Sequence, residues 1–155
     1  MRKAMLVLAV LGLAGSLWAA DPSLGTWKLN IAQSTFSPNR PAPKEETVVG
    51  KAVGDQIEVT ITGTAADGSP LPIKFTHPAE GGVLKADSSP LPPGVTVVVT
   101  VVEPGNFYWT FLKDGKQMRL NHFVVSKDGE TTRETIKGVS CDGKTLDELL
   151  LWDKQ

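Results

Sequence analysis

The chain has few of the residues from which catalytic and metal centres are most often built. Its 155 residues include one cysteine, Cys141, and two histidines, His77 and His122. A single cysteine excludes an internal disulfide, so packing alone must hold the fold together. Two histidines and one thiol without ligand spacing argue against a metal site, and we predict neither a metal nor a cofactor.

Helical patterns and paired charges are also scarce. Beyond residue 20, no segment of helix length is amphipathic, whereas Ile57, Val59 and Ile61 alternate with polar residues as in a half-buried strand. The adjacent acids Glu45 and Glu46 point to opposite faces of a strand, so they are no carboxylate pair. These patterns predict an all-β protein without catalytic residues. An enzyme is the third expectation, after a ligand-binding protein and a protein-interaction module.

Neither sign of charge is in large excess. The formal net charge is −1, and removing Arg2 and Lys3 with the N-terminal segment makes the remainder more acidic. A mildly acidic protein has no basic surface with which to attract nucleic acid or an anionic membrane. We therefore expect neither as a partner.

The first 20 residues have the pattern of a secretory signal peptide. Arg2 and Lys3 precede an apolar run from Ala4 to Leu17, and Ala19-Ala20 precede the polar start at Asp21. The run is shorter than the about 20 residues that span a bilayer. We expect a signal peptide at 1–20, a single β-barrel domain at 21–155, a secreted or periplasmic location, and no membrane anchor after cleavage.

One turn motif dominates the last third of the chain. Asp-Gly occurs at 114–115, 128–129 and 142–143, an even spacing of 14 residues, and Asp-Gly favours tight hairpins. The segments between these turns read as consecutive strands, and further strand patterns precede them. The prediction is an antiparallel up-and-down meander barrel of 8–10 strands, with at most one short helical turn, capped by Asn30, after the first strand. Closure would remove both sheet edges. A β-sandwich remains the alternative.

Short motifs at both ends of residues 21–155 resemble the lipocalin and fatty-acid-binding-protein (calycin) superfamily. Gly25-Thr26-Trp27-Lys28-Leu29 resembles its Gly-x-Trp opening, and 150–154 resembles the ending of the fatty-acid-binding branch. The whole of residues 21–155 also looks like a group of small exported bacterial proteins that begin with Gly-Thr-Trp-Lys-Leu-Asn, as at 25–30, and are described as lipocalin-like. The resemblance implies a barrel whose base is closed by Trp27 beside Gly25. Leu150 stands where fatty-acid binders place an arginine for the carboxylate. Arg133 is the best candidate for the basic residue that covers this tryptophan in lipocalins.

An aromatic row supplies the candidate ligand site. Phe107, Trp109 and Phe111 share one strand face, and a two-residue turn at 114–115 would bring them opposite His122, Leu120 and Met118. The predicted ligand-binding residues are Phe107, Trp109, Phe111, Leu120, His122 and Arg133. Plain core packing is the alternative for the aromatic residues.

The position of Arg133 depends on two further turns. Two-residue loops at 128–129 and 142–143 would place Arg133 opposite Val124 and Trp152, whereas a three-residue loop with a bulge would flip that register.

The function expected from these patterns is binding of a small hydrophobic ligand by an exported monomer without enzymatic activity. The alternative is a protein-interaction module with a filled barrel. A cavity of about 300 Å³ or more would favour the ligand-binding protein.

Overall fold

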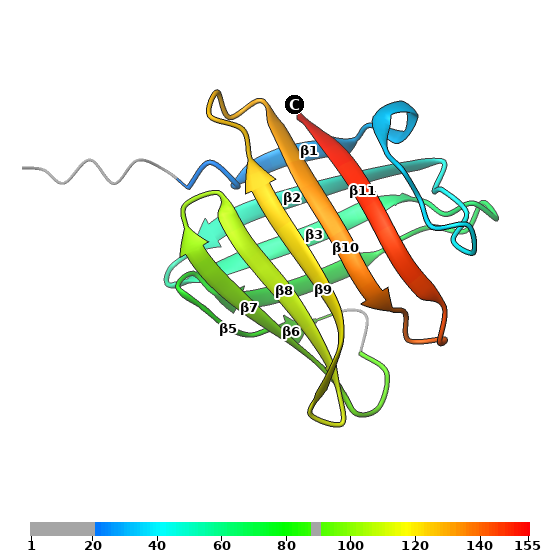
Figure 1. Ribbon diagram of the computed structural model, residues 1–155. Helices are drawn as coiled ribbons and strands as arrows, with labels where there is room; N and C mark the ends of the chain where they lie inside the picture. Colours follow the sequence, from blue (N-terminus) through cyan, green and yellow to red (C-terminus); the bar gives the residue numbers. More distant parts are fainter. Residues whose placement is uncertain (1–20, 88–90) are drawn as a thin grey trace, which may run out of the picture.

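The computed structural model describes residues 21–87 and 91–155, which form strands wound into a ring (Figure 1). The signal peptide expected at 1–20 lies outside these residues. The strands are β1 (Gly25–Leu29), β2 (Glu45–Val53), β3 (Gln56–Thr64), β4 (Ile73–Pro78), β5 (Gly81–Val83), β6 (Lys85–Ala86), β7 (Val95–Glu103), β8 (Asn106–Lys113), β9 (Lys116–Val125), β10 (Thr131–Val139) and β11 (Thr145–Lys154). A single 3-10 turn, η1 (Ile31–Gln33), follows β1.

Every strand pairing is antiparallel, and from β7 to β11 and from β1 to β4 neighbours in the sheet are also neighbours in the chain. The order is β5-β7-β8-β9-β10-β11-β1-β2-β3-β4-β6. The predicted up-and-down meander is therefore confirmed, with the first strand joined to the last through Leu29 and Trp152. Eleven strands replace the expected eight to ten because the segment after β4 is divided into β5 and β6.

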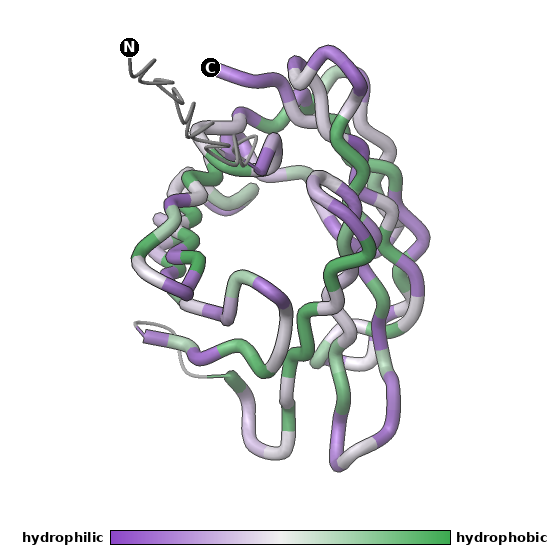
Figure 2. Tube along the Cα trace, turned by 90° about the vertical axis from the view of Figure 1, so that its left-hand side faces the viewer, coloured by the Kyte–Doolittle hydropathy of each residue, from purple (hydrophilic) through white to green (hydrophobic). Residues whose placement is uncertain are grey.

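The trace runs round a ring (Figure 2), and the divided segment nearly closes it. Its first part, β5, pairs with β7, and the N–H of Leu84 continues the ladder to the carbonyl of Val97 at 2.9 Å. Its second part, β6, pairs with β4, and the N–H of Asp87 donates to the carbonyl of Lys74 at 2.9 Å. One short segment thus shares its hydrogen bonds between both ends of the sheet, which leaves little unpaired edge.

The chain after β1 continues along β11. Asn30 caps η1, as predicted, by accepting from the N–H of Gln33 at 3.2 Å. Its own N–H donates to the carbonyl of Leu151, and Thr35 pairs with Leu149. Phe36 then packs back on the core. This course carries residues 37–40 to the rim of the barrel.

Two hydrophobic clusters fill opposite parts of the barrel. The first contains Trp27, Leu29, Ile136, Leu146, Leu150 and Trp152. The second contains Val59, Phe75, Leu84 and Val97. Trp27 is 5% exposed, and its indole N–H donates to the carbonyl of Ser23 at 2.8 Å. These contacts make Trp27 part of the packed core near the N-terminus.

The prediction that Arg133 covers Trp27 is wrong, because Lys154 does so. The Lys154 ammonium lies 4.3 Å from the centre of the Trp27 ring and donates to the carbonyl of Leu24. Gly25 has φ +112°, and a Cβ there would lie 3.0 Å from the same ammonium. Glycine therefore leaves room for this cation–π contact.

The register predicted for the β8–β9 hairpin is also wrong. The turn itself is the expected two-residue loop, with Lys113 opposite Lys116, but the register shifts between Phe111 and Leu112. As a result Phe107, Trp109 and Phe111 lie opposite Phe123, Asn121 and Arg119, and not opposite His122, Leu120 and Met118. One extra residue in β9 therefore reverses which of its side chains face inward.

The register of the β10–β11 hairpin also differs by one residue from the predicted one. Arg133 lies opposite Val124, as predicted, but its other partner is Leu151 and not Trp152. Ser140 closes the turn by donating its N–H to the carbonyl of Lys144 at 2.8 Å, so three residues form the loop. The longer loop moves Trp152 to the inner face, opposite Thr132.

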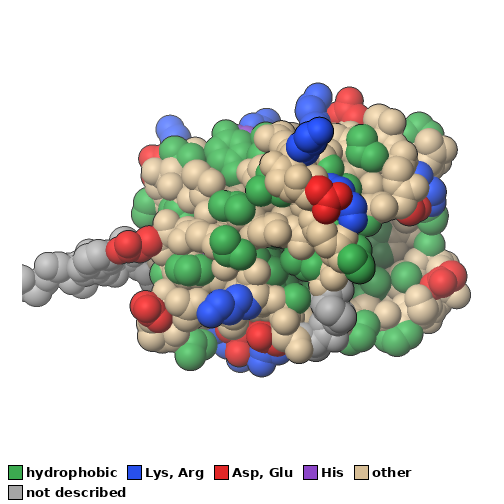
Figure 3. Space-filling model, turned by 90° about the horizontal axis from the view of Figure 1, so that it is seen from below, with side chains coloured by type: hydrophobic (Ala, Val, Ile, Leu, Met, Phe, Trp, Pro, Cys, Tyr) green, Lys and Arg blue, Asp and Glu red, His purple; other side chains and the backbone are tan. Residues whose placement is uncertain are grey.

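The outer surface is mixed in character. Seen from below, it carries acidic, basic and hydrophobic side chains interspersed, with no gathering of one sign of charge on that face (Figure 3). No helix in the two described ranges has the length and apolar character needed to cross a membrane.

Candidate functional site

The barrel contains a cavity of about 310 Å³ that is partly open to solvent. Apolar side chains from most of the ring form the larger part of its lining: Leu24, Trp27, Val48, Ile57, Val59, Ile61, Ile73, Trp109, Phe123, Ile136, Leu150 and Trp152. Polar and charged side chains form the remainder: Ser23, Arg40, Glu46, Arg119, Asn121, Thr132 and Glu134. An apolar cavity with a small set of convergent polar groups is typical of a small-molecule site.

The lining differs between two parts of the ring. We call the inner face of β9 and β10, with Arg119, Asn121, Thr132 and Glu134, the polar wall. We call the inner face of β3 and β4, with Ile57, Val59, Ile61 and Ile73, the apolar wall. In Figure 1, β9 and β10 lie in front and β2 and β3 cross behind them. A bound molecule would therefore meet a hydrocarbon surface on one side and hydrogen-bonding groups on the other.

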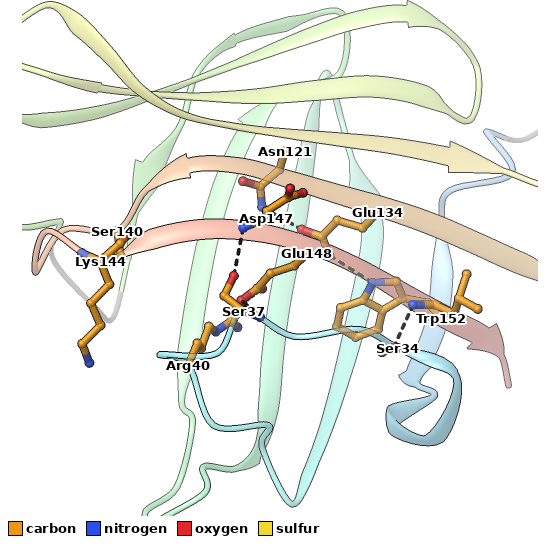
Figure 4. Close-up of polar contacts among 11 residues, drawn as sticks. Ser34, Ser37, Arg40, Asn121, Glu134, Ser140, Lys144, Asp147, Glu148 and Trp152 are labelled. Carbon is orange, nitrogen blue, oxygen red and sulfur yellow. Dashed lines mark hydrogen bonds and ion pairs between the residues drawn. The ribbon is translucent and has the colours of Figure 1, made fainter.

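Glu134 is the centre of the polar wall (Figure 4). Its Oε1 accepts from Asn121 Nδ2 at 2.7 Å, and its Oε2 accepts from Trp152 Nε1 at 3.0 Å. The residue is 5% exposed. Burial raises the pKa of Glu134 to about 7, although both hydrogen bonds favour the ionised form. Glu134 therefore changes charge near neutral pH inside the barrel.

A second buried carboxylate, Glu148, holds the rim segment in place. Its side chain is fully buried and forms an ion pair with Arg40, and its Oε1 accepts from the N–H of Ser37 at 3.2 Å. The hydroxyl of Ser37 in turn accepts from the N–H of Asp147 at 2.9 Å. These bonds fix Arg40 at the edge of the cavity (Figure 4).

Arg119 is a half-buried cation inside the barrel. Its guanidinium carbon lies 3.4 Å from the centre of the Phe111 ring. Burial lowers the pKa of Arg119, and the nearby Glu134 partly offsets this effect. Among the described carboxylates none forms an ion pair with Arg119. Facing the same cavity, Glu46 has its pKa raised by burial, against the opposing effect of Arg40.

Four buried atoms around the cavity have no hydrogen-bond partner within residues 21–87 and 91–155. They are Trp109 Nε1, Arg119 Nε, Asn121 Oδ1 and Thr132 Oγ1, and we call them the open polar atoms. All four residues line the cavity. Buried polar atoms are nearly always hydrogen-bonded, so such a cluster marks a place for water or ligand atoms.

The aromatic row predicted from the sequence does face inward, but it is mostly core. Phe107 stacks on Phe123 at 4.7 Å between ring centres, and Trp109 meets Phe75 edge-on at 5.2 Å. Of the three predicted residues, Trp109 lines the cavity, whereas Phe107 and Phe111 pack around it.

The other predicted ligand-binding residues lie on the outer face. Leu120 and His122 alternate with the cavity-lining residues of β9, and Arg133 alternates with those of β10. His122 stacks on Tyr108 with 4.1 Å between ring centres and contacts Asn106 Oδ1 through Nε2 at 2.9 Å. The structure therefore does not bring these three residues to the cavity.

Sequence reasoning missed the polar wall. Arg119 and Asn121 on β9 and Thr132 and Glu134 on β10 are of the residue types usually found on solvated faces. A usable signal was present in β9, because its other face is Leu120, His122 and Val124. A strand with apolar residues on its solvent side is consistent with polar residues inside.

Comparisons with known proteins leave the family open. No protein-family model matches this chain. No match is found among curated proteins either. Within the described ranges, no group of three or more histidine, cysteine, aspartate or glutamate residues is arranged to hold a metal ion.

Proposed function

We propose that this chain is an exported, calycin-like barrel that binds a small, mainly apolar molecule in its interior cavity. The observation that carries the proposal is the cavity of about 310 Å³ together with the open polar atoms on its lining. This volume lies at the low end of the roughly 300–1,000 Å³ found for small-molecule pockets. The site therefore suits a compact ligand better than a long acyl chain.

The two walls suggest how such a ligand would bind. The apolar wall removes the hydrocarbon part of the molecule from water, worth about 25 cal/mol for each Å² buried. The polar wall orients the other end through hydrogen bonds that the folded protein leaves unmade. The interaction-module alternative relied on a filled barrel, and the cavity gives it less support.

Titration with a small solvent-sensitive naphthalene dye tests this proposal. We expect saturable binding, an increase in dye emission and a change in tryptophan emission, because Trp27, Trp109 and Trp152 line the cavity. No saturable binding by folded protein, with tryptophan emission unchanged, would refute the proposal.

A pair of variants locates the binding. Gly50 lines the cavity, and an added Cβ would meet Ser23 and Leu24 at 3.7 to 3.8 Å, an ordinary contact distance. Gly50→Leu should therefore reduce dye affinity by occupying the cavity. Val53→Leu is the matched control, since Val53 is on the same strand and 56% exposed. Equal loss of affinity in both variants would place the dye elsewhere.

A further inference from the structure

The amide of Asn121 has one orientation that satisfies Glu134. Trp152 Nε1 is a donor only, and it occupies Glu134 Oε2 at 3.0 Å. The carboxylate needs a second donor at Oε1, and Asn121 Nδ2 supplies it at 2.7 Å. Asn121 Oδ1 is consequently turned away from Glu134. It is one of the open polar atoms, on a residue that is 4% exposed and lines the cavity.

A hydrogen-bond donor that complements this acceptor lies on the neighbouring strand. Trp109 is the cross-strand partner of Asn121, on the same inner face, and its Nε1 is another of the open polar atoms. Two neighbouring lining residues therefore carry one acceptor and one donor without partners in the described residues. A hydroxyl group can donate to the first and accept from the second. A ketone or ester oxygen can only accept, which leaves the buried Oδ1 unpaired.

We propose that Asn121 and Trp109 form a head-group subsite for a ligand with a hydroxyl group, an alcohol or a phenol on a compact apolar body, and that Glu134 is its positioning residue. This inference rests on the proposed function, since it names the ligand class of the same cavity. A carboxylate ligand fits this pair poorly, because it has no proton for Oδ1 and adds a negative charge near Glu134.

Protonation of Glu134 reverses the hydrogen-bonding character of the subsite. The proton is best placed on Oε1, because Trp152 donates to Oε2. The Oε1 hydroxyl then needs an acceptor, and turning the Asn121 amide over supplies Oδ1. This rotation presents Nδ2 to the cavity. With Trp109 Nε1, the subsite then has two donors and suits a ligand that only accepts.

Charged groups from other strands surround Glu134 and bias its protonation. Glu46 on β2 favours the protonated form of Glu134, and Arg40 on the rim segment opposes it. Arg119 on β9 interacts favourably with the ionised carboxylate, and Glu148 on β11 is paired with Arg40. Of these groups, Glu134 is the one whose protonation reverses the hydrogen-bonding character of the subsite, because its Oε1 accepts from the Asn121 amide.

A matched pair of probes tests the subsite. 1-Tetralol and 1-tetralone share one bicyclic skeleton and differ in whether the oxygen carries a proton. Isothermal titration of the purified protein at about pH 8.5 and about pH 5.5 brackets the pKa of Glu134, about 7. We expect the alcohol to bind about tenfold more tightly than the ketone at the higher pH, because the ketone leaves Oδ1 unpaired. The preference should vanish or reverse at the lower pH.

Glu134→Gln separates positioning from simple support of the fold. The glutamine oxygen accepts from Trp152, and its NH₂ donates to Asn121 Oδ1, so the amide is held in its turned orientation. The variant should therefore favour the ketone at both pH values. If Glu134 only supported the fold, Glu134→Gln would weaken the binding of both probes equally and leave the ratio of their affinities unchanged.

The outcomes are distinguishable. Binding of the dye with equal affinities for alcohol and ketone at both pH values in the wild-type protein overturns the subsite and leaves the proposed function standing. Folded protein that binds neither dye nor probe overturns both. If Glu134→Gln does not fold, the wild-type ratio at the two pH values still decides, since it needs no variant.

Discussion

The two walls of the cavity differ in what holds them and in what each can contribute to binding. The apolar wall on β3 and β4 packs with Phe75, Leu84 and Val97 in one hydrophobic cluster. The polar wall on β9 and β10 contains a buried carboxylate whose bonds are all to donors. Under the proposed function, the first wall would supply area and stability, whereas the second would supply selectivity. Buried polar networks contribute little net stability compared with apolar packing of the same volume.

The orientation of the polar wall depends on the bulge in β9, and Gly138 makes room for it. Gly138 lies opposite Arg119, has φ +129°, and would place a Cβ 2.2 Å from the carbonyl oxygen of Met118. Gly138→Val should destabilise the protein by at least about 4 kcal/mol or prevent folding, because backbone atoms cannot give way as side chains do. Urea unfolding measures the loss.

Gly143→Ala is the control for that variant. Gly143 also has positive φ, +84°, but an added Cβ would meet nothing within 4 Å. Gly143→Ala should lower the free energy of unfolding by about 1 kcal/mol, because a residue with a side chain adopts positive φ less readily than glycine. Similar losses in the two variants would mean that the bulge does not depend on Gly138.

Removing bulk from the hydrophobic cluster of the apolar wall should have the next largest effect. Phe75 is 4% exposed and meets Trp109 edge-on. Phe75→Ala should lower the free energy of unfolding by about 3–5 kcal/mol through lost burial and a new void. It should also enlarge the cavity and admit bulkier ligands while the preference between alcohol and ketone stays. A changed preference would mean that the two walls are not separable.

The apolar wall was predictable from the sequence, and the polar wall was not, for a physical reason. Ile57, Val59 and Ile61 are apolar at every second position, so burial of that face follows in any register. Arg119, Asn121 and Glu134 face inward because of one inserted residue in β9 and the packing of the ring around them. A bulge costs little and has no fixed residue signature, so hairpin turn chemistry alone could not show it. The evenly spaced Asp-Gly turns specified the order of the strands without specifying which faces point inward.

The polar wall should make stability depend on pH. The pKa of Glu134 is raised to about 7 from an ordinary value of 4.5, so the folded protein binds more protons than the unfolded chain between these pH values. Stability should therefore fall as the pH rises from about 4.5 to about 7, by about 3 kcal/mol from this group. Urea unfolding at several pH values measures the slope.

Glu134→Gln is the control for this pH dependence, since it cannot ionise. The variant should lose most of the decrease between pH 4.5 and 7. A wild-type slope that survives in Glu134→Gln would assign the effect to another buried acid, with Glu46 the first candidate because burial also raises its pKa.

The smallest effect is expected where Lys154 covers Trp27. Lys154 covers the Trp27 ring at 4.3 Å and donates to the carbonyls of Leu24 and Pro22. Lys154→Met keeps the length of the side chain but removes the charge, and should cost about 1 kcal/mol in thermal or urea unfolding. Lys154→Arg should stay within about 0.5 kcal/mol of the wild type, because a guanidinium also stacks on an indole. Neither variant should alter the alcohol-to-ketone ratio, since Lys154 does not line the cavity. A changed ratio in Lys154→Met would show that the Lys154–Trp27 contact and the polar wall are coupled through Trp27, which lines the cavity and belongs to the same core cluster as Trp152.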